Sequence, residues 1–78
     1  MGRMKKPFAA AGAFGDRVRA LREGLGWSQE KLAEESGLHG TYISSIERGE
    51  RNISLLNILR IARALRIDPG QLVLGLTP

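Results

Sequence analysis

The 78-residue sequence contains no cysteine and only one histidine, and these shortages exclude several kinds of site. Without cysteine the chain has neither a disulfide framework nor a thiolate zinc site. His39 has no partner for a metal site, and the sequence offers no phosphate-cradling glycine loop and no nucleophile–base pair. We therefore expect that the protein is not an enzyme and needs neither a cofactor nor a metal.

Long apolar segments are also missing from the sequence. No apolar run reaches the ~18 residues that a membrane span requires, and the basic start of the chain lacks the apolar core of a signal peptide. The sequence therefore predicts a cytoplasmic protein without membrane contact. The length suits one domain with a small core, and the formal charge of +4 favours a polyanionic partner.

Two parts of unequal size are predicted. Residues 1–12, with three basic side chains, are interpreted as a flexible basic N-terminal arm, and residues 13–78 as the folded domain. Such an arm either follows the phosphates or the minor groove of DNA, or it is a solvated tail. The sequence alone leaves both alternatives open.

Residues 28–49, SQEKLAEESGLHGTYISSIERG, predict two short helices joined by a tight turn. Ser28 is a suitable N-cap, and Gly37 allows the positive φ required where the first helix ends. Ala33 is small enough for the helices to cross, and Ile43 and Ile46 face inward from a helix over residues 40–48. The residues expected to point outward are short or polar: Gly40, Thr41, Ser44, Ser45 and Arg48. Such a helix fits the DNA major groove, about 12 Å wide, although an ordinary helical hairpin is the alternative.

Helices are also predicted on both sides of this segment. The first spans residues 13–24 and has Val18, Leu21 and Leu25 on its apolar side. A helix over residues 54–65 begins after the N-cap Ser54, and a short last helix begins at Asp68. The residues of the 54–65 helix expected to face the core are Leu55, Ile58, Ile61, Ala62 and Leu65.

Two apolar features remain outside that core. Leu56 and Leu59 fall off the core-facing side, and the ending QLVLGL over residues 71–76 is too apolar for a free tail. We therefore predict a homodimer, which would place two recognition helices about 34 Å apart. The predicted interface residues are Leu56, Leu59, Ile67, Leu72, Val73 and Leu74. The alternative is that the last three cover the core of the monomer.

The segments SQEKLAEESGL and YISSIERG, in this register, resemble the helix-turn-helix of the Cro/phage-repressor type, also called the xenobiotic-response-element family. The stretch TYISSIERGERN is most similar to the small controller proteins of restriction–modification systems. The resemblance covers roughly residues 14–74 and implies an all-α, compact five-helix, lambda-repressor-like domain with a central helix-turn-helix. It also implies an internal ion pair between Arg22 and Glu47.

The DNA contacts predicted from the residues and from this resemblance fall into two groups. Phosphate contacts are expected from Gln29, and phosphate or groove-edge contacts from the loop after the recognition helix. Base contacts are expected near the start of the recognition helix. Gly40 stands where controller proteins often carry a large basic residue, so we expect specificity to depend on DNA shape or on the arm. The full predicted set is Gln29, His39, Gly40, Thr41, Tyr42, Ser44, Ser45, Arg48, Arg51 and Asn52.

The sequence thus favours a homodimeric transcriptional regulator that binds a palindromic operator in double-stranded DNA and either occludes or recruits RNA polymerase. A narrower hypothesis makes it the controller of a restriction–modification operon. The alternative is an antitoxin-like protein-interaction module with secondary DNA binding, for which QLVLGL would be the partner site.

Overall fold

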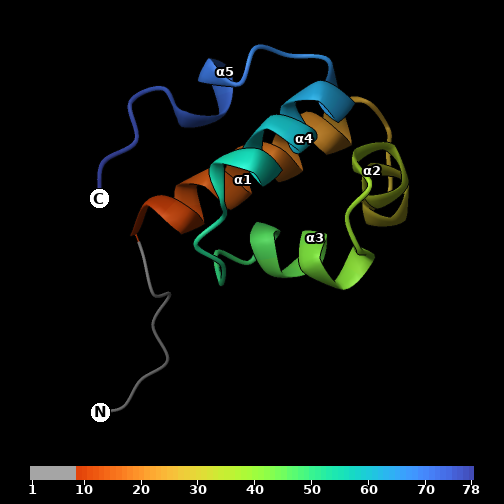
Figure 1. Cartoon of the computed structure of the whole chain (residues 1–78), viewed down its shortest axis with the longest axis horizontal. Coiled ribbons are helices and arrows are strands. Elements are labelled where there is room, and N and C mark those ends of the chain that lie inside the picture. The colour runs from red at the N-terminus through yellow and green to blue at the C-terminus, as the bar shows by residue number, and fades with distance from the viewer. Residues whose placement is uncertain (1–8) are drawn as a thin grey trace.

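A computed structural model describes residues 9–78, and within that range all regular structure is helical (Figure 1). The helices are α1 (Ala9–Gly24), α2 (Gln29–Ser36), α3 (Gly40–Glu47), α4 (Leu55–Leu65) and α5 (Gly70–Val73). α3 packs against α1 and α2, α4 packs against α2, and α5 packs against α1. The predicted all-α, five-helix architecture is confirmed for these residues.

Local side-chain chemistry sets several helix ends. The Ser28 hydroxyl accepts a hydrogen bond from the backbone N–H of Lys31 at 3.0 Å, as expected of an N-cap. Gly37 ends α2 with a φ of 76°, which its missing Cβ permits. The Ser54 hydroxyl caps α4 in the same way as Ser28 caps α2, by accepting from the backbone N–H of Asn57 at 3.2 Å. These caps therefore fix both ends of α2 and the start of α4.

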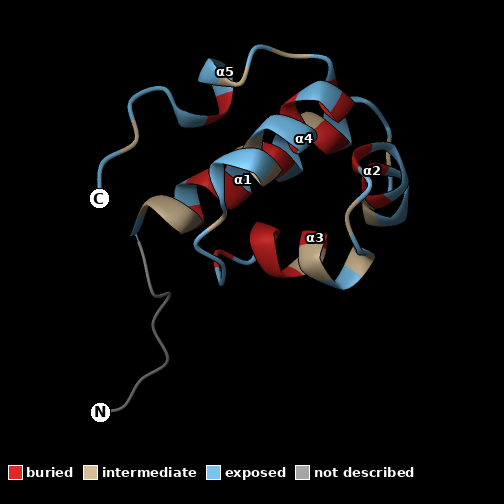
Figure 2. Cartoon of the chain, viewed as in Figure 1, coloured by how far each residue is buried: buried red, intermediate tan, exposed pale blue. Residues whose placement is uncertain are grey.

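The core lies between α1, α2, α3 and α4 and also includes Leu72 of α5, and Figure 2 shows the inward sides of the four longer helices as buried. Gly15 brings α1 into backbone contact with α3: a Cβ at this position would lie 2.3 Å from the carbonyl oxygen of Ile46. Only glycine permits so close an approach. The fully buried aliphatic side chains include Val18, Leu32, Ile43, Ile61 and Leu72.

Three details differ from the sequence prediction. α1 begins at Ala9 rather than at residue 13, because residues 9–12 are small residues dominated by alanine, the best helix former. The rest of the predicted arm lies outside the described residues. Leu25 is exposed because it follows the end of α1. Leu55 is 71% exposed because it is the first residue of α4, and the part of that helix buried in the core begins only at Ile61. The short last helix begins at Gly70, and the Asp68 carboxylate accepts a hydrogen bond from its backbone N–H at 3.1 Å.

Candidate nucleic-acid interface

α2 and α3 form a helix-turn-helix in which the start of α3 faces solvent. Thr41 and His39 are exposed, whereas Ile43 and Ile46 anchor the opposite side of the helix in the core. A Cβ at Gly40 would meet nothing within 4 Å, so packing does not require a glycine there. The exposed start of α3 is therefore free to approach a DNA groove, and its first residue, Gly40, contributes only backbone.

The inner end of α3 is held by a buried ion pair, the one that the resemblance implied. Arg22 donates from Nε to Glu47 Oε2 at 2.7 Å and from Nη2 to Glu47 Oε1 at 3.0 Å. A third hydrogen bond runs from Arg22 Nη1 to the carbonyl oxygen of Trp27 at 2.7 Å. Burial acts to raise the pKa of Glu47, but the hydrogen bonds from Arg22 and Gln29 outweigh it and lower that pKa overall. The pair thus joins α1, the following turn and α3.

Gln29, predicted to contact phosphate, lies at the first position of α2 and is half-buried. Its Nε2 donates to Glu47 Oε1 at 3.0 Å, so one of its two amide N–H groups already has an acceptor within the protein. The second amide N–H and the backbone N–H groups of the first turn remain for a phosphate. Local sequence patterns do not indicate this contact, because it joins residues eighteen positions apart.

Ser45 does not point outward, and that part of the prediction is wrong. The residue is only 4% exposed, because it shares the side of α3 that carries Tyr42 and the loop after α3 folds over that side. Its hydroxyl donates to the carbonyl oxygen of Tyr42 at 2.8 Å and accepts from Arg51 Nε at 3.0 Å. The Arg51 guanidinium lies 5.5 Å from the centre of the Tyr42 ring.

Arg48 follows Glu47 at the C-terminal end of α3, where its exposed side chain is engaged by its neighbours. It donates from Nε and Nη2 to the two carboxylate oxygens of Glu50 at 2.9 and 3.0 Å, and from Nη1 to the hydroxyl of Ser44. The hydrogen bond with Glu50 raises the pKa of Arg48. A DNA phosphate that binds this guanidinium would have to compete with a carboxylate already in place.

A further polar contact connects α3 with α4. Asn57 donates from Nδ2 to the hydroxyl oxygen of Tyr42 at 3.1 Å, and its own Oδ1 accepts from Arg60 Nη1 at 2.9 Å. Tyr42 is half-buried and packs against the core, while its hydroxyl reaches this amide. Asn57 on α4 therefore holds the Tyr42 side chain of α3 in place. The helical periodicity of α3 or of α4 does not reveal this contact.

The residues predicted to form a dimer interface divide into two sets. Leu56, Leu59, Val73 and Leu74 are exposed, and Leu74 reaches 75%. Ile67 is half-buried against the core. Leu72 is fully buried within the monomer, so its predicted place in an interface is wrong. The last turn of the chain folds back on the domain, and this places the Leu72 side chain in the core.

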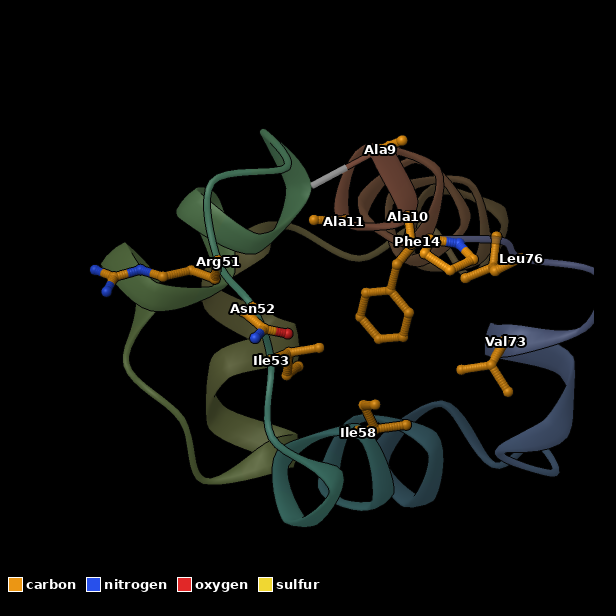
Figure 3. Close-up of a pocket in the computed structure, with 11 residues that line it drawn as sticks. Ala9, Ala10, Ala11, Phe14, Arg51, Asn52, Ile53, Ile58, Val73 and Leu76 are labelled. Atoms are coloured by element: carbon orange, nitrogen blue, oxygen red, sulfur yellow. The ribbon is translucent and has the colours of Figure 1, made fainter. Parts of the chain in front are cut away.

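Figure 3 shows a cavity that the sequence did not predict. It has a volume of about 710 Å³ and lies between the start of α1, the loop before α4 and the C-terminal tail. Phe14, Ile53, Ile58 and Val73 turn towards its centre, whereas the side chain of Arg51 extends away from it (Figure 3). The cavity wall is thus mainly apolar, and the arginine belongs to the surface of the α3 loop.

Within residues 9–78, no helix is both long enough and apolar enough to cross a membrane. The same range contains no group of three histidine, aspartate or glutamate side chains placed to hold a metal ion.

Comparison with known proteins gives matches over most of the chain. A family model described as Helix-turn-helix matches residues 18–72. Control protein C.BamHI of Bacillus amyloliquefaciens is 54% identical over 61 residues, which cover 77% of this chain and 75% of that protein. The restriction-modification controller protein C.AhdI from Aeromonas hydrophila superposes with a TM-score of 0.81 at 51% identity, covering 83% of this chain and 98% of that one. The P22 c2 repressor, solved with a synthetic operator, gives a TM-score of 0.73 at 34% identity over 80% and 94% of the two chains.

Proposed function

Because the chain belongs to the helix-turn-helix family, we propose that it is the controller of a restriction–modification operon and binds a palindromic operator as a homodimer. The observation that carries this proposal is the similarity to a restriction-modification controller along nearly that protein's whole length. The coarser function, that of a helix-turn-helix DNA-binding regulator, follows from the family match itself. The relatives described above are regulators and not enzymes.

The proposed DNA-binding surface is centred on the exposed start of α3. Thr41, from its first turn, would contact base edges, and Tyr42 and Ser44 would lie at the groove. Arg48, Arg51 and Asn52 would meet phosphates or groove edges on one side of α3. Gln29 would meet a phosphate on the other side. His39 lies between them, in the turn that joins α2 to α3. Arginine contacts of this kind supply much of the affinity because they release condensed counterions from DNA.

Gly40 gives this surface a particular character. Position 40 has room for a side chain and lacks one, so the start of α3 offers mainly hydroxyl groups for direct base contacts. Hydroxyls bond to several bases and therefore discriminate weakly between them. We propose that sequence-dependent DNA shape and deformability contribute much of the operator specificity.

The proposed dimer would form through the exposed apolar residues of α4 and the tail. Leu56 and Leu59 lie one turn apart on α4, Val73 is the last residue of α5, and Leu74 follows it. Several large apolar side chains exposed on one small domain are typical of an interaction surface. A two-fold dimer would present two α3 helices to successive major grooves, about 34 Å apart, which is why the proposed operator is palindromic.

The test is selection from a pool of random duplexes with the purified protein at about 0.15 M salt, a concentration at which weak non-specific binding is screened. A two-fold symmetric consensus with half-sites about one helical turn apart supports the proposal. Sedimentation of the free protein at micromolar concentration supplies the oligomeric state. A monomer that selects no consensus would contradict the proposal and favour a protein-interaction module.

A further inference from the structure

The hydroxyl of Ser45 has a fixed orientation, because both of its hydrogen-bonding roles are occupied. A serine hydroxyl has a single proton, and here that proton is donated to the carbonyl oxygen of Tyr42 one turn earlier. A lone pair is thereby turned towards Arg51, whose Nε lies 3.0 Å away. Since Ser45 is buried, solvent does not compete strongly for either bond.

A second contact holds the same guanidinium from another side. The ring of Tyr42 faces Arg51 at 5.5 Å, a cation–π distance, and the Tyr42 hydroxyl is itself held by Asn57. Within the described residues, the hydrogen bond of Arg51 uses Nε alone; the residue is exposed, and Figure 3 shows its side chain extended away from the cavity. Its two Nη groups are therefore available to an external acceptor.

We propose that Ser45 is a positioning residue for Arg51: it does not touch DNA itself, but it fixes the guanidinium so that both Nη groups meet acceptor oxygens of the DNA backbone. This inference rests on the proposed function. A free arginine loses much rotamer freedom when it binds a phosphate, whereas a guanidinium already held at Nε and against a ring loses less. Ser45 thus contributes to affinity through Arg51.

The first experiment tests the positioning without DNA. In ¹⁵N-labelled protein, exchange of the Arg51 Nε–H with water is expected to be about fivefold slower than that of Arg63, an exposed arginine on α4, because a hydrogen bond must open first. Ser45→Ala should raise the exchange rate to that of Arg63. Ser45→Cys, which keeps the side-chain size but replaces the oxygen by a weak acceptor, should do the same.

Ser36→Ala is the matched control. Ser36 is equally buried, and its hydroxyl likewise bonds to the carbonyl oxygen of the residue one turn earlier, but it lies on α2 and does not contact Arg51. It should leave Arg51 exchange unchanged. Equal exchange rates for Arg51 in wild type and Ser45→Ala would overturn the proposal.

The second experiment is a double-mutant cycle on the palindromic duplex that the wild-type protein selects. Ser45→Ala should weaken binding about fivefold, and Arg51→Ala should weaken it more. In the Arg51→Ala background, Ser45→Ala should change affinity by less than about twofold. Equal losses in both backgrounds would mean that Ser45 acts on the fold and not on Arg51. Failure of the wild type to select any duplex would instead reject the proposed function, and the exchange measurement would still decide the Ser45–Arg51 contact.

Discussion

Arg22 on α1 and Glu47 at the end of α3 are joined by two hydrogen bonds of 2.7 and 3.0 Å, with the Glu47 side chain fully buried. Glu47 Oε1 also accepts from Gln29 at 3.0 Å, so one carboxylate ties together α1, the start of α2 and the end of α3. The exposed start of α3 is therefore held at a set angle by its buried end.

Breaking this pair from one side should strongly destabilise the protein. Glu47→Gln leaves Arg22 buried without its counter-charge, and we expect a loss of about 3–5 kcal/mol in the free energy of unfolding, measured by urea denaturation. Glu35→Gln is the matched control, because it removes a carboxylate from the exposed Lys31–Glu35 pair and should cost far less. Similar losses for the two variants would contradict a special role for the buried pair.

Acid should destabilise the fold through the same carboxylate. The pKa of Glu47 is lowered in the folded protein, with 4.5 as its ordinary value, so the unfolded chain binds a proton more readily. The stabilisation by Glu47 is therefore complete above about pH 4.5 and is lost as the pH falls through the lower folded pKa. Thermal unfolding followed from pH 7 to pH 2 should show Tm falling in this acidic range. A carboxyl titration by NMR that places the Glu47 pKa at or above its ordinary value would refute the assignment.

Gly15→Ala should disturb the seating of the recognition helix. Its Cβ would lie 2.3 Å from the carbonyl oxygen of Ile46 and 2.9 Å from that of Glu47, and backbone atoms cannot rotate away as a side chain would. We expect a loss of about 1–3 kcal/mol in unfolding free energy together with weaker DNA binding. Gly24→Ala, at the other end of α1, meets nothing within 4 Å and should leave both quantities nearly unchanged.

Gln29→Ala should weaken binding to all DNA sequences alike. A lost phosphate contact carries no base information, so the preferred operator should stay the same. Because the Gln29 amide is uncharged and neutralises no phosphate, the salt dependence of binding should change little. The substitution also removes a hydrogen bond to Glu47, so binding must be measured well below the unfolding temperature of the variant. Glu34→Ala, an exposed change on the same helix, serves as the control. A loss confined to one operator would show that Gln29 reads bases.

Leu56→Lys or Leu59→Lys should shift the protein towards monomer. Both leucines are exposed on α4, and a charge there would be buried without a partner in the proposed dimer. Leu25→Lys makes the same change at an exposed leucine after α1 and should leave the dimer intact. Sedimentation equilibrium at micromolar concentration measures all three variants. An unchanged mass for both α4 variants would remove these residues from the interface.

Features that depend on near neighbours in the chain could be predicted from the sequence. Ser28 and Ser54 cap helices because their hydroxyls reach a backbone N–H three residues on, and Gly37 ends α2 because only glycine readily takes its backbone conformation. The inward positions of Ile43 and Ile46 follow from helical spacing. The family resemblance could be drawn because it rests on the same local pattern.

Which side chains are covered by distant segments depends on the folded arrangement of the helices and could not be predicted from the sequence. Ser45 looked free because the periodicity of α3 leaves it outside the core, but the loop carrying Arg51 folds over it. Leu72 looked like an interface residue and fills the core, while Leu55 looked buried and is exposed. Burial depends on what packs across from a residue, and that is set by contacts between segments far apart in the chain. Periodicity within one helix therefore indicates a side, but it does not specify what covers that side.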